Sequence, residues 1–184
     1  MDNKEHKLQI AEVVGTWVAV ITVIIGGVFG LIEYLDHKEG LEVDRAFDFV
    51  NRYQSNDHLV QARLNISSVT EERLPAISEI LKNPNLNEDE LAEAYHSQIM
   101  KIIKQKKLSS SLEQVFTFYE QVLLCRTMEL CDETVLKNFF DNDAGSLTRS
   151  FYPYICTLRK DWNNLNVYKR VTDFYIGNSE ELCP

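Results

Sequence analysis

The stretch that decides the fold is Val13–Ile32, VVGTWVAVITVIIGGVFGLI, which contains no charged residue. A helix rises about 1.5 Å per residue, so this run gives about 30 Å, the thickness of the hydrocarbon core of a bilayer. Trp17 and Tyr34 stand near its two ends, where membrane helices favour aromatic residues. The stretch therefore predicts a transmembrane helix over residues 13–35.

A cleaved signal peptide and a buried core helix are the alternatives to a transmembrane helix here. The apolar run is longer than the roughly 7–15 apolar residues of a signal peptide. In addition, Lys4 and Lys7 are offset by Asp2 and Glu5. A core helix of this length would carry a polar stripe. The transmembrane helix is therefore preferred to both.

Small residues recur at intervals of three or four along the run, which places Gly15, Ala19, Thr22, Gly26 and Gly30 on one helix face. Helices in lipid associate where small residues let their backbones approach. The stripe therefore predicts a homo-oligomer, although glycine and alanine are common in any membrane helix.

Two carboxylates, Glu12 and Glu33, lie close to the same face at its two ends. In an oligomer they would form a ring of carboxylates at each mouth, as in many cation pathways. These residues indicate a pore, and the alternative is that they mark the helix ends.

The composition of the chain after the predicted membrane helix favours a helical domain in the cytosol. We expect a flank over residues 1–12, the membrane helix, and a cytosolic domain over 36–184. The net charge of −9 makes nucleic acid an unlikely partner. The four cysteines lack the paired spacing of a zinc site, so we expect buried, reduced thiols and no metal or cofactor.

Apolar periodicity without any alternating pattern predicts an all-α bundle. Asn87 with Glu90, and Ser110 with Glu113, have the form of capping boxes. The helix after Ser110 is the most apolar and is expected to be central. The expected helices are 41–54, 58–69, 70–82, 87–107, 112–128, a short helix from Asp132 to Phe140, 146–163 and 167–175. A break at Gly40 precedes the first of them, Asp132 caps the short helix, and a loop over 141–145 follows it. A bend is expected at Pro75 and a kink at Pro153.

The chain lacks the common catalytic motifs: there is no Gly-rich phosphate loop, Gly-x-Ser-x-Gly elbow or His-Glu-x-x-His pair. Glu93 and His96 have the spacing of a di-iron ligand pair, but no second copy follows. Arg159 precedes Asn164 by five positions. Helical RNA-cleaving domains of the HEPN type have Arg, four residues, then His. Asparagine cannot serve as an acid or base near neutral pH, so ordinary helix termination is the alternative role of this pair.

Three segments carry a resemblance to known proteins, namely Phe47–Tyr53, Phe116–Asp132 and the stretch from Tyr152 to Asn164. Through them the chain resembles a family of unknown function, bacterial single-pass membrane proteins with a helical cytosolic domain. Its layout is also similar to that of the small membrane accessory proteins of type VI-B CRISPR systems. That resemblance implies a HEPN-like bundle and assembly into a pore.

These observations lead to three hypotheses of function. The first is an oligomeric single-pass protein of the bacterial cell membrane that forms a pore in antiphage defence. The second is a membrane-anchored helical domain that recruits a cytosolic protein partner. The third is a HEPN-like ribonuclease that uses Arg159 and Asn164. An enzyme is the least favoured of the three.

Overall fold

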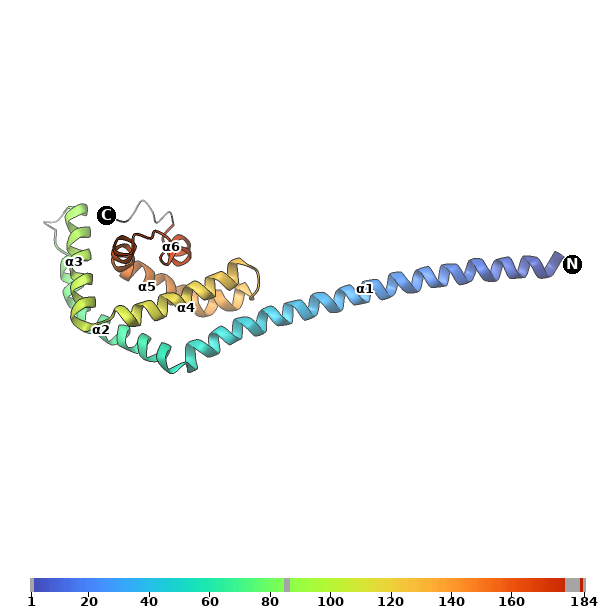
Figure 1. The fold of residues 1–184 in the computed structure, drawn as a ribbon, viewed down its shortest axis with the longest axis horizontal. Helices are drawn as coiled ribbons and strands as arrows, with labels where there is room; N and C mark the ends of the chain where they lie inside the picture. Colours follow the sequence, from blue (N-terminus) through green and yellow to red (C-terminus); the bar gives the residue numbers. More distant parts are fainter. Residues whose placement is uncertain (1, 85–86, 178–182, 184) are drawn as a thin grey trace. The chain divides into compact units, whose positions relative to one another are not determined.

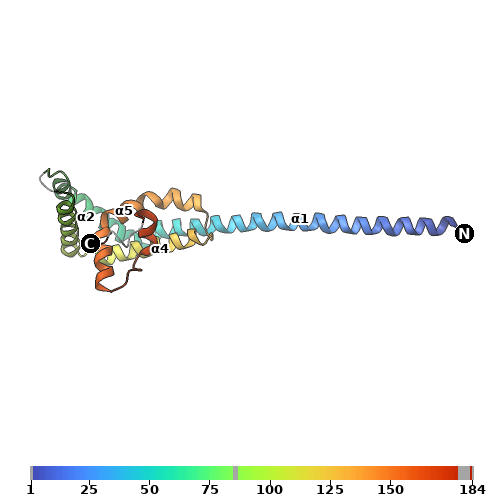
Figure 2. The ribbon, with the colours of Figure 1, turned by 90° about the horizontal axis from the view of Figure 1, so that it is seen from above.

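The computed structural model describes residues 2–84, 87–177 and 183, and for residues 2–16, 18–20 and 74 it describes the backbone alone. The described part of the chain is helical and has no strand, which confirms the all-α prediction. The chain divides into two units, Met1–Glu42 and Val43–Pro184. Figures 1 and 2 show the helices in two views at right angles.

Helix α1 runs without a break over Asp2–Ser55 (blue to cyan in Figure 1) and so contributes to both units. The expected break at Gly40 is wrong, because this residue is helical. One glycine in a helix costs about 1 kcal/mol relative to alanine. Its neighbours Lys38, Glu39 and Leu41 are good helix formers, so the helix continues through it.

The prediction of a transmembrane helix over residues 13–35 is wrong. No helix in the described part of the chain combines the length and the apolar character that crossing a bilayer requires. The expectations of a single-pass protein in the bacterial cell membrane and of a pore are withdrawn with it.

The second unit contains the end of α1 and, among its described residues, five further helices. They are α2 (Asp57–Leu81), α3 (Glu88–Lys106), α4 (Ser109–Thr127), α5 (Glu133–Asp161) and α6 (Lys169–Tyr175). Helices α2, α5 and α6 all pack on α4, while α3 packs on α2 and α5. The expectation that the most apolar helix is central is therefore confirmed.

Three of these helices begin with a polar capping residue. The Asn87 side chain accepts a hydrogen bond from the Glu90 N–H, and the Glu90 carboxylate accepts one from the Asn87 N–H, which confirms the predicted capping box. Asp132 caps α5 as expected. At α2 the cap is Asn56, one residue before the expected Asp57.

Other helix boundaries differ from the prediction. Helix α2 continues through Thr70 and Pro75. The expected capping box at Ser110 is wrong, since the cap position of α4 is Leu108, two residues earlier, and it has no side-chain cap hydrogen bond. The Leu108 side chain is fully buried and its N–H donates to the carbonyl of Ile103, which closes the turn between α3 and α4.

The expected loop over 141–145 is also wrong, because α5 continues through it. Ala144 and Gly145 are buried there. A Cβ at Gly145 would lie 3.1 Å from Cδ1 of Tyr175, so glycine allows this ring to approach. The kink predicted at Pro153 is present, with non-helical angles at Phe151, because proline lacks an N–H and its ring crowds the preceding turn.

The expectation of reduced thiols is wrong. Cys125 forms a disulfide with Cys131, and Cys156 forms one with Cys183. The first pair meets because the chain reverses at the end of α4, where the Leu130 N–H donates to the Cys125 carbonyl. Disulfides are rare in the reducing cytosol. The cysteines therefore lend no support to the predicted cytosolic position of this domain.

Candidate ligand-binding groove

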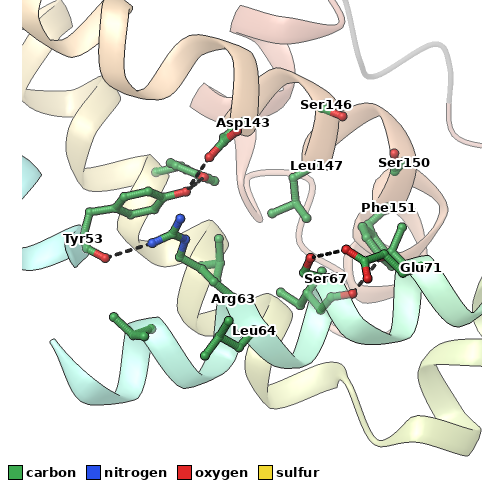
Figure 3. A pocket seen from close by; sticks show the side chains of 15 residues that line it. Tyr53, Arg63, Leu64, Ser67, Glu71, Asp143, Ser146, Leu147, Ser150 and Phe151 are labelled. Carbon is green, nitrogen blue, oxygen red and sulfur yellow. Dashed lines mark hydrogen bonds between the residues drawn. The ribbon is translucent and has the colours of Figure 1, made fainter. Parts of the chain in front are cut away.

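A groove of about 440 Å³ lies in the second unit between α2 and α5 (Figure 3). Val115 and Tyr119 of α4 and Tyr53 of α1 complete its lining. Apolar and polar residues alternate around it. The lining residues are Tyr53, Val60, Arg63, Leu64, Ile66, Ser67, Thr70, Glu71, Val115, Tyr119, Asp143, Ser146, Leu147, Ser150 and Phe151.

A chain of hydrogen bonds forms one end of the groove. The Tyr53 hydroxyl donates to Oδ2 of Asp143 at 3.0 Å and lies 2.8 Å from the hydroxyl of Tyr119. Because the single Tyr53 proton goes to the carboxylate, Tyr119 donates to Tyr53. Burial raises the pKa of both tyrosines above their usual 10.0. Both hydroxyls therefore stay protonated near neutral pH, and they hold the Asp143 carboxylate in place.

Arg63 is held by the same tyrosine. Its guanidinium carbon lies 3.5 Å from the centre of the Tyr53 ring, a close cation–π contact. Its Nη1 donates to the Tyr53 carbonyl at 3.0 Å, as Figure 3 shows. This carbonyl belongs to the last turn of α1, where no helical N–H is left to pair with it. Arg63 therefore caps α1 and faces the groove at the same time.

The rest of the groove mixes apolar and polar side chains. Leu64 on α2 and Leu147 and Phe151 on α5 supply its apolar wall. At its far end the Ser67 hydroxyl donates to Oε1 of Glu71 at 3.5 Å (Figure 3). The groove thus joins an apolar wall to a few fixed polar groups, which is the usual composition of a small-molecule site.

Helical spacing explains why these side chains gather. The lining positions recur every three or four residues on α2 from Val60 to Glu71 and on α5 from Asp143 to Ser150. Sequence reasoning did not identify any of them. The same spacing of mixed polar and apolar residues is ordinary on a solvated helix face. The spacing was therefore only a weak indication of a groove.

The candidate pair Arg159 and Asn164 lies elsewhere, at the junction of α5 and α6. Arg159 is 2% exposed and donates to the Val167 carbonyl at 3.0 Å and to the Thr172 hydroxyl at 2.6 Å. The Asn164 N–H donates to the Arg159 carbonyl, and its exposed side chain accepts from the Asn166 N–H. Both residues thus hold the turn between the two helices.

The predicted helix-packing residues all belong to α1. Thr22, Gly26, Gly30 and Glu33 are exposed. The side chains of Glu12, Gly15 and Ala19 lie outside the described residues. The predicted role of this face in helix packing stays a prediction.

Metal ligands do not gather in the described part of the chain, where no group of three or more His, Cys, Asp or Glu residues could hold a metal ion. Nε2 of His96 lies 3.5 Å from the Thr157 hydroxyl, and Glu93 is exposed on the same helix.

Comparison with known proteins gives one match. A family model described as a domain of unknown function, DUF4760, matches residues 9–176. No curated protein and no solved structure matches the chain. The matched range includes every residue that lines the groove.

Proposed function

Because the chain belongs to the DUF4760 family, a family of unknown function, we propose its role from the groove: this domain binds a small amphipathic molecule between α2 and α5. The observation that carries the proposal is the way Tyr53 fixes an arginine and a carboxylate beside an apolar wall. The volume of about 440 Å³ lies within the range of ligand sites in proteins, about 300–1,000 Å³.

The chemistry of the lining favours binding over catalysis. General acid–base catalysis needs a group whose pKa lies near the working pH. The two tyrosine hydroxyls of the groove have pKa values raised above 10.0 by burial, and no lining residue is a histidine or cysteine. Arg63 supplies a guanidinium group with several N–H donors. These groups are suited to hold a polar molecule in one orientation.

The test is methyl NMR of the full-length protein titrated with indole, benzamide, benzoate and benzylamine. We expect at least one compound to shift the methyl signals of Leu64 and Leu147, while those of the exposed Leu124 and Leu165 stay in place.

A filled groove is the control. Leu147→Trp should abolish the shift of the Leu64 signal, whereas Leu165→Trp, at a position 58% exposed and outside the lining, should leave that shift unchanged. The proposal is wrong if none of the four compounds moves the Leu64 and Leu147 signals of the unchanged protein, or if Leu147→Trp leaves the Leu64 shift intact.

A second role is self-association through α1, and we propose a second copy of this chain as the partner. Large apolar side chains such as Val23 and Phe29 are 74% and 68% exposed in the first unit. A Cβ at Gly26 or Gly30 would meet nothing within 4 Å, although glycine weakens a helix by about 1 kcal/mol. An identical helix packed on this glycine face would bury the exposed apolar side chains and would need glycine there for close approach.

The mass of the full-length protein, measured by light scattering in a mild non-ionic detergent, tests this second role. We expect a multimer, and we expect Gly26→Leu combined with Gly30→Leu to reduce it to the monomer mass. Gly27→Leu changes a glycine that is equally unpacked but lies off the stripe, so it should leave the multimer intact. A monomer in the unchanged protein would contradict self-association.

A further inference from the structure

We infer that the molecule bound in the groove is a zwitterion of the α-amino-acid class with an apolar side chain. This inference rests on the proposed function, because it names the ligand class of the same site. Three features of the groove carry it: a fixed cation, a fixed anion that is not paired with that cation, and an apolar wall beside both.

The cation and the anion are fixed by one residue. Tyr53 accepts the Arg63 hydrogen bond with its carbonyl and donates its hydroxyl proton to Asp143. Among the described residues, no ion pair joins Arg63 to Asp143, although both side chains line the same groove. Two opposite charges held near each other without pairing suit a ligand that itself carries both charges.

Arg63 is suited to the carboxylate of such a ligand. Its guanidinium has five N–H donors, and the described part of the chain supplies one acceptor, the Tyr53 carbonyl. The Tyr53 ring covers one face of the guanidinium and limits its rotation. An edge with parallel N–H groups is therefore left for a carboxylate, which arginine binds through two hydrogen bonds.

Asp143 is suited to the ammonium group. Its Oδ2 accepts the Tyr53 proton, and its Oδ1 has no hydrogen-bond partner in the described part of the chain. Ser146, one turn further along α5, also lines the groove with a hydroxyl. An ammonium has three donors, so a carboxylate oxygen and a hydroxyl on one helix face can share it.

The apolar wall then selects the side chain. Leu64, Leu147 and Phe151 line the groove beside the two charges, together with polar residues such as Ser67 and Glu71. Burial of an aliphatic or aromatic side chain against them is favourable by about 25 cal/mol per Å² of apolar surface. A free amino acid such as phenylalanine therefore matches the charges, the apolar wall and the volume of about 440 Å³.

The experiment compares three ligands by calorimetry with the full-length protein: L-phenylalanine, phenethylamine, which lacks the carboxylate, and 3-phenylpropionate, which lacks the ammonium. We expect phenylalanine to bind at least tenfold more tightly than either analogue. An analogue that binds as tightly as phenylalanine would overturn the zwitterion and leave the groove as a binding site. Failure of all three, together with the four NMR probes, would overturn the binding proposal itself.

Two variants test which residue binds the carboxylate of the ligand and which binds its ammonium group. Arg63→Gln should weaken phenylalanine binding at least tenfold and leave phenethylamine unchanged, while Asp143→Asn should weaken phenylalanine similarly and leave 3-phenylpropionate unchanged. Lys137→Gln, which removes an exposed charge outside the lining, should affect none of the three. If Arg63→Gln weakens all three ligands equally, its role is only structural and the inference is overturned. Circular dichroism of each variant confirms that it is folded, and Arg63→Lys should recover part of the affinity.

Discussion

Tyr53 joins the groove to the core of the second unit. Its ring stacks on Phe118 at 5.3 Å between centroids and meets Phe140 edge-on at 5.1 Å. Its backbone carbonyl and its hydroxyl hold the two charged side chains of the groove. The groove is therefore rigid where its charges lie, because one buried residue contributes both to packing and to polar contacts.

Replacing Tyr53 with phenylalanine separates these two contributions. The ring contacts remain, while the Tyr119 hydroxyl is left buried without this partner and Asp143 loses a donor. We expect the free energy of unfolding to fall by about 1–3 kcal/mol, which urea denaturation measures. Tyr34→Phe, at a position 63% exposed, is the control and should change stability by less than about 0.5 kcal/mol. Equal stability of the two variants would contradict the hydrogen-bonded role of Tyr53.

At the scale of a helix, the two predicted capping boxes have different outcomes. The box at Asn87 is formed, while α4 begins without a side-chain cap behind the buried Leu108. A polar cap satisfies one N–H of a helix start. A buried leucine instead fixes where the helix begins, because moving it out of the core would expose apolar surface.

A pair of alanine variants tests this difference. Asn87→Ala should lower the free energy of unfolding by about 1 kcal/mol, because the Glu90 N–H loses its acceptor. Ser110→Ala should change it by less than about 0.5 kcal/mol, because the Ser110 hydroxyl caps no N–H of α4. Urea denaturation of both variants gives the comparison, and a larger effect at Ser110 would contradict the observed start of α4.

Across the whole molecule, two disulfides close loops of different length. Cys156 and Cys183 are 27 positions apart, and Cys125 and Cys131 are 6 apart. In the chain-entropy model, a cross-link stabilises more when it closes a longer loop in the unfolded state. The link to Cys183 also ties the end of the chain to α5.

Single serine variants measure this difference. Cys183→Ser should lower the free energy of unfolding by about 3.5 kcal/mol and Cys125→Ser by about 2 kcal/mol in denaturation without reductant. Reductant should lower the stability of the unchanged protein and have no effect on the variant that carries both substitutions. Insensitivity of the unchanged protein to reductant would show that these disulfides do not contribute.

Buried tyrosines make the stability of the whole molecule depend on pH in the alkaline range. Burial raises the pKa of Tyr53, Tyr119, Tyr154 and Tyr175 above the usual 10.0. Above that pH the unfolded chain releases these protons while the folded chain retains them. Proton release then favours unfolding, so the stabilisation is fully present below pH 10 and is lost progressively above it.

Urea denaturation between pH 8 and pH 11.5 tests this dependence. We expect the free energy of unfolding to be nearly constant up to about pH 10 and then to fall. The fall should be shallower in Tyr53→Phe, which removes one titrating group. Absorbance at 295 nm should show the phenolates forming together with unfolding. A stability that stays constant to pH 11.5 would contradict the burial of these hydroxyls.

The features that sequence reasoning predicted correctly are local ones. The all-α class, the capping box at Asn87, the cap at Asp132 and the kink near Pro153 each depend on residues within about one helical turn. The central position of α4 follows from its apolar composition. The transmembrane prediction also came from a local pattern, and it was wrong because no helix in the described part of the chain is long and apolar enough to cross a bilayer.

The sequence by itself therefore determined that the chain forms helices and where capped helices begin, because hydrogen bonds and side-chain spacing within a few residues decide these features. Only the tertiary structure decided which cysteines pair and that Arg63 and Asp143 both contact Tyr53. Tyr53 and Asp143 are 90 positions apart. Their meeting depends on the packing of α1, α4 and α5 around one core, which no local pattern encodes.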